Sequence, residues 1–299
     1  MKIFQQLAFT KMHGLGNDFV VLDSLRFPLP DSFDFARAAT QICDRHFGIG
    51  GDGLLLLCAP DDNAKSQGAN VRMRMWNPDG SEDMCGNGLR CVARLAHGRG
   101  YVDESFTVQT HAGLRGCEIL DSENIRVAMG KPAFSFAAIP FAPSDEVESN
   151  IEYSISIDNI ILPHVSTLST GSAHTIIFVN TLPDNETFAR LSPQIENHAW
   201  FPQRTSIMWA RVLDVENIAI RIWERGIQEA SGLTGETLAC GTGACATAVA
   251  AAVTRRCGDK VKVHSRGGVL EIAWRDGEEI TMTGAAVAVF EGVYGLQVA

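Results

Sequence analysis

The chain has 299 residues, about twice the length of a typical single domain, so two domains are expected. Hydrophobic residues make up 45% and charged residues 20% of the sequence, which excludes an intrinsically disordered, collagen-like or coiled-coil protein. The formal net charge is −10, and Lys and Arg form no cluster. A nucleic-acid partner is therefore not expected, because such binding depends largely on neutralising phosphates.

The sequence indicates a cytoplasmic protein with no membrane partner. Its first twelve residues lack an apolar stretch of signal-peptide length, and no later segment reaches the roughly 18 apolar residues of a membrane span. The eight cysteines contain no C-x-x-C pair and no spacing to histidine that is typical of a metal site. We expect reduced thiols and no metal.

Both halves of the sequence repeat one order of elements. Each half is predicted to contain an apolar strand, an amphipathic helix, a half-buried strand, a Gly-rich turn that begins with a cysteine, and a second helix. In the first half these elements are expected at 19–22, 33–46, 71–76, 85–88 and 89–97. In the second half they are expected at 176–179, 186–198, 218–223, 240–243 and 244–256.

The repeat predicts an α/β fold (mixed α+β) of two pseudo-symmetric domains. Each domain is expected to be a mixed β-sheet wrapped around a central α-helix, with the active site in the cleft between the two domains. The first domain is expected at 1–131 plus 285–299, and the second, an internal repeat of the first, at 132–284. Residues 131–150, with three prolines and an acidic end, are the predicted linker.

The cysteine of each turn, Cys85 or Cys240, directly precedes the first turn of a predicted helix. There the helix dipole favours thiolate and lowers the pKa of a thiol below its usual value of about 8.5. The glycines that follow leave backbone N–H groups uncovered at the helix start, which suits a carboxylate ligand. Each half therefore predicts one proton carrier beside half of an anion site.

Two thiols on opposite sides of one bound carboxylic acid are the arrangement of a racemase or epimerase. One cysteine as thiolate removes the α-proton, and the other as thiol delivers a proton to the opposite face. The two helix starts stabilise the charge that develops on the carboxylate, so no cofactor is required. An alternative from another class is a non-catalytic amino-acid-binding protein or thiol redox sensor that uses the same two cysteines.

Four segments of the chain resemble the diaminopimelate epimerase family, whose cofactor-independent enzymes serve lysine and peptidoglycan-precursor synthesis. The segments are TKMHGLGNDFVVLD at 10–23, CDRHFGIGGDGLLLL at 43–57, NPDGSEDMCGNGLR at 77–90 and GETLACGTGACA at 235–246. The resemblance implies interconversion of LL- and meso-diaminopimelate by a two-base proton transfer at the α-carbon. It also implies a small-molecule amino-acid substrate and a homodimer.

The same resemblance implies roles for individual residues. Cys85 and Cys240 match the catalytic thiols, and His174 and Glu224 match residues that tune them. The positions that match substrate-binding residues are Asn17, Asn77, Gly86, Asn87, Ser172, Ser206, Glu224, Arg225, Gly241 and Thr242.

The sequence departs from the family pattern at two of these positions. Ser172 stands where the family has the asparagine of Gly-Asn-Pro-His, and Ser206 where it has the asparagine of Arg-Thr-Asn. About eight extra residues also lie within 227–234. A racemase of another amino acid on the same scaffold is therefore the alternative within the same class.

The segment GIGGDG at 48–53 satisfies the G-x-G-x-x-G pattern of dinucleotide sites. A helix-like segment precedes it and the apolar run 54–57 follows, the reverse of the strand-then-helix order that such a site requires. No nucleotide cofactor is predicted.

Overall fold

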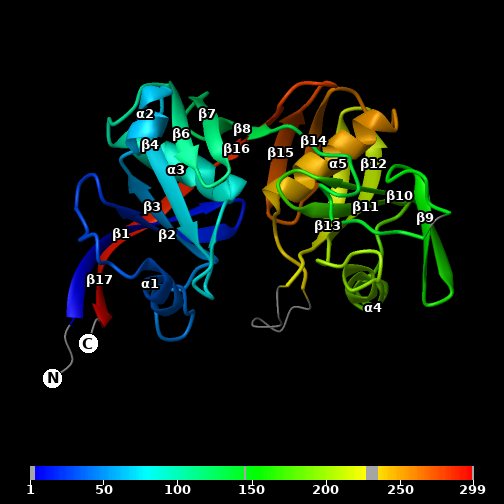
Figure 1. Ribbon diagram of the computed structural model, residues 1–299, viewed down its shortest axis with the longest axis horizontal. Coiled ribbons are helices and arrows are strands. Elements are labelled where there is room, and N and C mark those ends of the chain that lie inside the picture. The colour runs from blue at the N-terminus through cyan, green and yellow to red at the C-terminus, as the bar shows by residue number, and fades with distance from the viewer. Residues whose placement is uncertain (1–3, 145, 227–234, 298–299) are drawn as a thin grey trace. The chain divides into compact units, whose positions relative to one another are not determined.

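The computed structural model describes residues 4–144, 146–226 and 235–297. By its contacts the chain divides into two compact units, one formed by Met1–Ala128 with Thr283–Ala299 and the other by Met129–Met282. Strands outnumber helices in both, and the α/β class predicted from the sequence is confirmed (Figure 1). None of the described helices is long and apolar enough to span a membrane.

The first unit begins and ends with long strands. Its helices are α1 (Phe35–Ile42), α2 (Asp62–Ser66) and α3 (Gly86–Gly98). Its strands are β1 (Phe4–Gly14), β2 (Asn17–Asp23), β3 (Gly53–Cys58), β4 (Val71–Trp76), β5 (Glu82–Asp83), β6 (Ser105–Thr110), β7 (Gly113–Ile119), β8 (Asn124–Gly130, which ends beyond the unit) and β17 (Val287–Gln297).

The second unit follows a similar order. Its helices are α4 (Asn185–Glu196) and α5 (Gly241–Val253). Its strands are β9 (Tyr153–Ile157), β10 (Ile160–Ser169), β11 (Ala173–Phe178), β12 (Ser206–Asp214), β13 (Asn217–Trp223), β14 (Lys260–Ser265), β15 (Gly268–Ala273) and β16 (Ile280–Ala285, which also ends beyond the unit).

The strand pairings of the first unit recur in the second. β2 and β3 are parallel and joined through α1, as β11 and β12 are parallel and joined through α4. β4 and β6 are parallel and flank α3 in sequence, as β13 and β14 flank α5. Antiparallel β3–β4 likewise corresponds to β12–β13, and β6–β7 to β14–β15.

The helices that follow the two cysteines lie inside their units. α3 contacts β1, β2, β3, β4, β7 and β17, and α5 contacts β10, β11, β12, β14 and β15. Their side chains explain this position, because Leu89, Val92 and Ala93 of α3 are fully buried, as are Cys245 and Val249 of α5. Strands on several sides of a helix require apolar or small residues around most of its circumference.

The segment predicted as a linker packs against the second unit. Ile139 and Phe141 are buried in the core of this unit, together with Phe188 and Trp209. Ala133 forms a β-bridge to a strand of the same unit, β10. Two apolar side chains anchor the segment to this unit, while others of its described residues, such as Ala138 and Ser149, are exposed.

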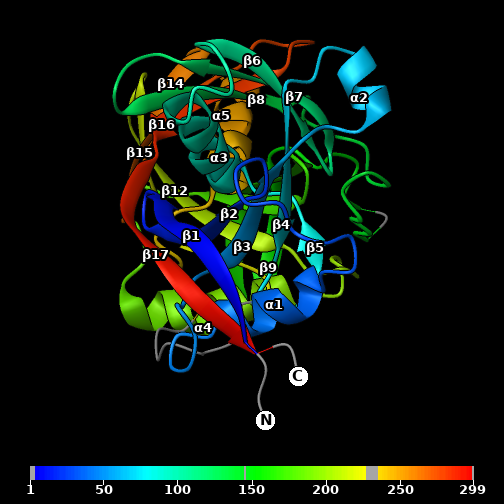
Figure 2. The same ribbon diagram turned by 90° about the vertical axis from the view of Figure 1, so that its left-hand side faces the viewer.

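The tail after Gly284 continues into β17, which pairs antiparallel with β1 over nearly the whole length of both strands. Figure 2 shows the two strands side by side.

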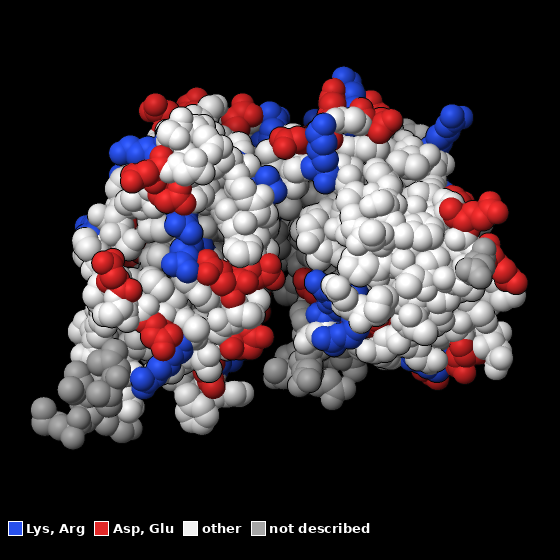
Figure 3. Space-filling model, viewed as in Figure 1, with Lys and Arg blue, Asp and Glu red and all other residues white. Residues whose placement is uncertain are grey.

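Charged side chains of both signs are interspersed on the face shown in Figure 3. Surface ion pairs of the protein include Arg126–Glu118 and Arg190–Asp158.

Leu89 gives a direct test of the role of α3. Its side chain is fully buried, so Leu89→Ala should lower the free energy of unfolding by about 3 kcal/mol through lost transfer energy and a residual cavity. Phe47, which is 90% exposed, is the matched control, and Phe47→Ala should change this free energy by less than about 0.5 kcal/mol. Urea unfolding followed by circular dichroism measures both, and equal losses would contradict the core position of α3.

Candidate active site

Cys85 and Cys240 occupy equivalent backbone positions in the two units. Each is the N-cap residue of a buried helix and has an extended conformation, with φ −135° and ψ 125° at Cys85 and φ −132° and ψ 110° at Cys240. The carbonyl oxygen of each accepts the N–H of the residue four positions later, Leu89 or Ala244. Both sulfur atoms therefore lie beside the positive end of a helix.

The glycines of both turns allow close packing. A Cβ atom at Gly88 would lie 3.0 Å from Leu55 Cδ2, and a Cβ atom at Gly243 would lie 2.2 Å from Met208 Cε. A Cβ atom at Gly243 would also lie 3.3 Å from Cys240 Sγ. Gly243 therefore leaves room both for the packed methionine and for the thiol.

In the first unit, two asparagines predicted to bind substrate meet the cysteine. Asn17 Oδ1 lies 3.6 Å from Cys85 Sγ and accepts a hydrogen bond of 3.2 Å from Asn87 Nδ2. Arg90, which is fully buried, donates to Asn87 Oδ1 at 2.9 Å and fixes the orientation of that amide. Gly86, the first residue of α3, lies between Cys85 and Asn87.

Asn77 lies in the turn between β4 and β5. Its side-chain amide donates to Ser81 Oγ at 3.1 Å, and its backbone N–H donates to the Ser81 carbonyl at 2.8 Å. These hydrogen bonds stabilise the turn, and they hold the Asn77 side chain to its own loop instead of joining it to the amides around Cys85.

In the second unit, His174 on β11 lies beside the cysteine. Its Nδ1 is 2.7 Å from the Ser172 carbonyl oxygen, which only accepts, so Nδ1 carries the ring hydrogen. Burial, with a smaller contribution from the positive charge of Arg225, lowers the pKa of His174 to about 4. The ring is neutral at pH 7, and Nε2 is an acceptor 3.2 Å from Thr242 Oγ1 and 3.8 Å from Cys240 Sγ.

The sulfur of Cys240 also has donors around it. The backbone N–H of Gly243 donates to Sγ at 3.4 Å, and Thr242 Oγ1 lies 3.4 Å from it. Gly241 and Thr242 are the first two residues of α5. The Thr242 carbonyl accepts the Thr170 hydroxyl at 2.9 Å, which ties this helix start to the end of β10.

Ser206, one of the two serines that replace asparagines of the family pattern, supports Arg225, which is predicted to bind substrate. Ser206 Oγ, almost fully buried at the start of β12, accepts the backbone N–H of Arg225 at 3.2 Å. The Arg225 guanidinium donates to the Gln203 carbonyl at 3.1 Å, and the Glu224 backbone N–H donates to the Gly235 carbonyl at 3.2 Å. Ser206 lies opposite His174 in the β11–β12 register. The extra residues at 227–234 lie outside the described residues.

Glu196 is a supporting residue that the sequence analysis did not find. Its buried carboxylate accepts Trp223 Nε1 at 2.6 Å and the backbone N–H of Gly226 at 2.9 Å, so it holds both ends of the turn that contains Glu224 and Arg225. It also pairs with Arg204 at 3.2 Å. The sequence did not indicate this supporting role, because a glutamate at the end of an amphipathic helix is usually exposed to solvent.

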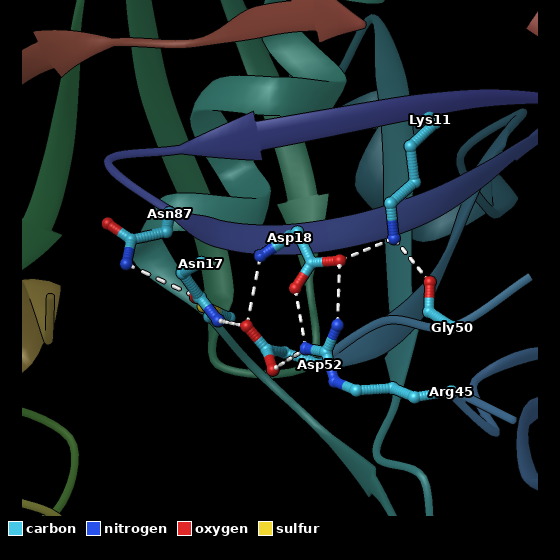
Figure 4. A network of polar contacts seen from close by, with 8 residues as sticks. Lys11, Asn17, Asp18, Arg45, Gly50, Asp52 and Asn87 are labelled. Atoms are coloured by element: carbon cyan, nitrogen blue, oxygen red, sulfur yellow. Dashed lines mark hydrogen bonds and ion pairs between the residues drawn. The ribbon is translucent and has the colours of Figure 1, made fainter. Parts of the chain in front are cut away.

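A charged network next to Asn17 also escaped the sequence analysis. Asp52, from the Gly-rich segment rejected as a nucleotide site, accepts Asn17 Nδ2 at 2.7 Å and Arg45 at 2.7 Å. Figure 4 shows that Arg45 also donates to Asp18 and that Lys11 donates to Asp18 in turn. Burial raises the pKa of Asp52; burial also opposes ionisation of Asp18, but Arg45 and Lys11 outweigh it and lower the pKa of Asp18.

The chain is similar to known proteins over most of its length. The family model for diaminopimelate epimerase matches residues 9–135 and 166–289. Diaminopimelate epimerases of Heliobacterium modesticaldum and Desulforudis audaxviator are 40% and 42% identical to this chain. Each alignment covers 96% of this chain, with 99% and 98% of the respective relative.

The chain belongs to the diaminopimelate epimerase family. This confirms the resemblance that the four sequence segments carried.

Solved structures of low sequence identity share the fold of this family member. A PhzF-family phenazine biosynthesis protein of Bacillus anthracis has a TM-score of 0.64 and 20% identity, covering 97% of this chain and 99% of that one. A hydroxyproline epimerase from Agrobacterium vitis has a TM-score of 0.67 and 15% identity, covering 99% and 94%. At these identities the likeness shows the fold alone.

Burial of neutral His174 should make stability depend on pH. The unfolded chain binds this proton near the ordinary pKa of 6.5 and the folded chain only near 4, so the stability that His174 contributes is present above pH 6.5 and is lost as the pH falls towards 4. Between pH 7 and 4.5, the unfolding free energy of the wild type should fall by about 2 kcal/mol more than that of His174→Gln.

Urea unfolding across this pH range measures the difference. The exposed His111 provides the control, and His111→Gln should follow the wild type. Parallel curves for wild type and His174→Gln would show that His174 titrates normally in the folded protein.

Proposed function

We propose that this chain interconverts LL- and meso-diaminopimelate, with Cys85 and Cys240 as the two proton carriers. The observation that supports the proposal most strongly is the duplicated placement of two cysteines at buried helix starts in a member of the diaminopimelate epimerase family. The activity named for the relatives is an epimerisation, and this site offers a thiol chemistry that suffices for it without a cofactor.

The reaction needs one base and one acid. In the proposed mechanism, the thiolate of one cysteine takes the α-proton, and the electron pair of the broken C–H bond passes into the substrate carboxylate. The thiol of the other cysteine then gives its proton to the opposite face of the α-carbon. The two cysteines have exchanged protonation states after one turnover, so the reverse reaction uses them in the opposite roles.

The helix starts would hold the carboxylate while it carries the extra charge. The N–H groups of a first helical turn have no partner within the helix, and here they belong to Gly86 and Asn87 in α3 and to Gly241 and Thr242 in α5. Fixed donors of this kind stabilise a developing oxyanion without reorganisation. Glu224 and Arg225 are assigned to the polar groups at the other end of the substrate.

Single cysteine variants test the two-base mechanism. Cys85→Ala and Cys240→Ala should each fold, yet lose at least about 100-fold in kcat, because each removes a positioned acid or base. Cys91→Ala is the matched control: Cys91 is a fully buried cysteine of α3 whose thiol pKa is raised to about 12 by burial, and its loss should leave kcat within about threefold. Near-normal epimerisation by either of the first two variants would contradict the mechanism.

The substrate is tested separately, because Ser172 and Ser206 replace amides of the family pattern. Each hydroxyl offers one donor on a shorter side chain, whereas an amide offers two donors, so we expect a distal pocket that is wider and poorer in donors. The Arg225 fork can still bind a distal carboxylate in a bidentate manner. The wild type should therefore have the highest kcat/KM for LL-diaminopimelate in a panel with lysine, ornithine, histidine and glutamate.

A tenfold preference for another amino acid would support the alternative of a different racemase on this scaffold. In that case the Ser172→Asn, Ser206→Asn double variant should move the preference back towards diaminopimelate. A redox sensor or binding protein would exchange no α-proton of any member of the panel with D2O.

The cytoplasmic location and the homodimer expected from the sequence stay predictions of this proposal. So do the domain boundaries at 131 and 285 and the absence of a nucleic-acid partner. Analytical ultracentrifugation of the purified chain measures the oligomeric state directly.

A further inference from the structure

The orientation of the Asn17 side chain is determined by a carboxylate. Asn17 Nδ2 lies 2.7 Å from Asp52 Oδ2, and a carboxylate oxygen only accepts hydrogen bonds. The NH2 group of Asn17 must therefore face Asp52, and its carbonyl oxygen must face the other way. That oxygen is the atom 3.6 Å from Cys85 Sγ.

The other amide at the site has a matching orientation. Arg90 donates to Asn87 Oδ1, so Asn87 Nδ2 is free to donate to Asn17 Oδ1 at 3.2 Å. The Asn17 oxygen thus receives one hydrogen bond from Asn87 and a second from the thiol of Cys85. An acceptor that faces a thiol stabilises its protonated form, because the thiolate has no hydrogen to donate.

Asp52 itself is held in place from three directions. Its Oδ2 accepts the backbone N–H of Asp18 at 3.0 Å, its Oδ1 accepts Arg45 at 2.7 Å, and the Asp52 N–H donates to the Asp18 carbonyl at 2.7 Å. Arg45 also binds Asp18 Oδ1 at 2.7 Å (Figure 4). Asp52 is therefore fixed relative to β2, the strand on which Asn17 lies.

The glycines of the GIGGDG segment make room for this network. The Gly50 carbonyl accepts Lys11 Nζ, and a Cβ atom at Gly51 would lie only 3.2 Å from Lys11 Nζ and from the Asp18 carbonyl oxygen. Gly50 has a φ of +81°, which favours glycine. The motif that resembles a nucleotide-binding pattern serves in this fold to bring Asp52 to Asn17.

The surroundings of the second thiol are different. Cys240 Sγ accepts the backbone N–H of Gly243 at 3.4 Å, a contact that favours thiolate, whereas the acceptor His174 Nε2 lies farther from it, at 3.8 Å. Cys85 Sγ instead donates to a carbonyl oxygen whose direction Asp52 fixes. The two thiols are therefore equivalent in backbone position but not in their hydrogen-bond partners.

We propose that Asp52 is a positioning residue of the reaction: by fixing the Asn17 amide, it keeps the proton on Cys85 in the resting enzyme. The proposal rests on the proposed function, in which Cys85 is a proton carrier. It implies that the resting enzyme is asymmetric, with Cys85 as the acid and Cys240 as the base.

Charged groups on both sides of Asn17 also act on the Cys85 thiol, and their influence must be distinguished from that of the Asn17 orientation. Asp52, Asp18, Arg45 and Lys11 lie on one side, and Arg90 lies on the other, next to Asn87. Loss of the Asp52 charge would by itself favour thiolate at Cys85. The experiment therefore has to show whether Asp52 acts through Asn17.

A double-mutant cycle of Asp52→Asn and Asn17→Ala makes this distinction. The probe is the rate of alkylation of Cys85 by iodoacetamide between pH 5.5 and 9.5, measured by peptide mass spectrometry with Cys240 as internal reference. Alkylation requires no substrate, so its outcome is independent of whether the protein epimerises diaminopimelate. Asp44→Asn is the matched control, since Asp44 is exposed, lies beside Arg45 in sequence and only caps its own turn.

Asp52→Asn should allow the Asn17 amide to turn and shift the midpoint for Cys85 alkylation towards acid by about one pH unit, a tenfold faster reaction below the midpoint. Asn17→Ala should shift it in the same direction, and Asp52→Asn should add no further shift in that background. Asp44→Asn and the Cys240 midpoint should stay unchanged.

Two results would overturn the proposal. An equal shift by Asp52→Asn with and without Asn17 would mean a direct effect of charge, and an unchanged midpoint in Asp52→Asn would mean that the amide is not held by Asp52. If Asp52→Asn fails to fold by circular dichroism, Asn17→Ala alone decides, because an unmoved midpoint there would exclude the Asn17 oxygen as the acceptor that holds the proton.

Discussion

In each unit a cysteine directly precedes the start of a buried helix, and most other features of the site follow from this arrangement. A buried helix start has backbone N–H groups that need acceptors, and it carries a partial positive charge. Strands can surround α3 and α5 because small and apolar residues cover these helices, and glycines let the first turn lie close to its neighbours. In each unit this places a thiol next to backbone N–H groups that have no partner within their helix.

The two cysteines have equivalent backbone positions in their units but different polar partners. Around Cys85, amides and a charged network dominate, and Asn17 is oriented by Asp52. The sulfur of Cys240 instead contacts a neutral histidine, a threonine hydroxyl and a backbone N–H group. A reaction that needs an acid and a base at the same time benefits from such a difference, because two identical thiols would have the same proton affinity.

Much of the architecture could be predicted from the sequence because it depends on local signals. The helices after the two cysteines begin at Gly86 and Gly241, within a few residues of the expected starts, since glycine turns and apolar periodicity are short-range features. The helix expected at 33–46 is shorter in the structure and ends at Ile42. Asp44 stops its continuation by accepting the N–H groups of His46 and Phe47 in a separate turn.

The supporting residues could not be predicted in this way, because their roles depend on long-range pairing. Asp52 reaches Asn17 only through the parallel register of β2 and β3, in which Phe19 lies opposite Gly53. Glu196 reaches Gly226 from the end of a helix thirty residues away in sequence. Among the expected substrate contacts, Asn77 has its side chain in its own turn, a detail that a motif does not carry.

The most direct test of a two-thiol reaction is the position of solvent label at low conversion. When LL-diaminopimelate is incubated with the enzyme in D2O and quenched before about a tenth has reacted, a two-base reaction places deuterium at the α-carbon of the meso product, because the acid has exchanged with solvent. The recovered LL substrate should contain almost none, since the base that took its proton returns the same proton. Equal label in recovered substrate and product, measured by NMR and mass spectrometry, would indicate one base that serves both faces and would contradict the two-thiol mechanism.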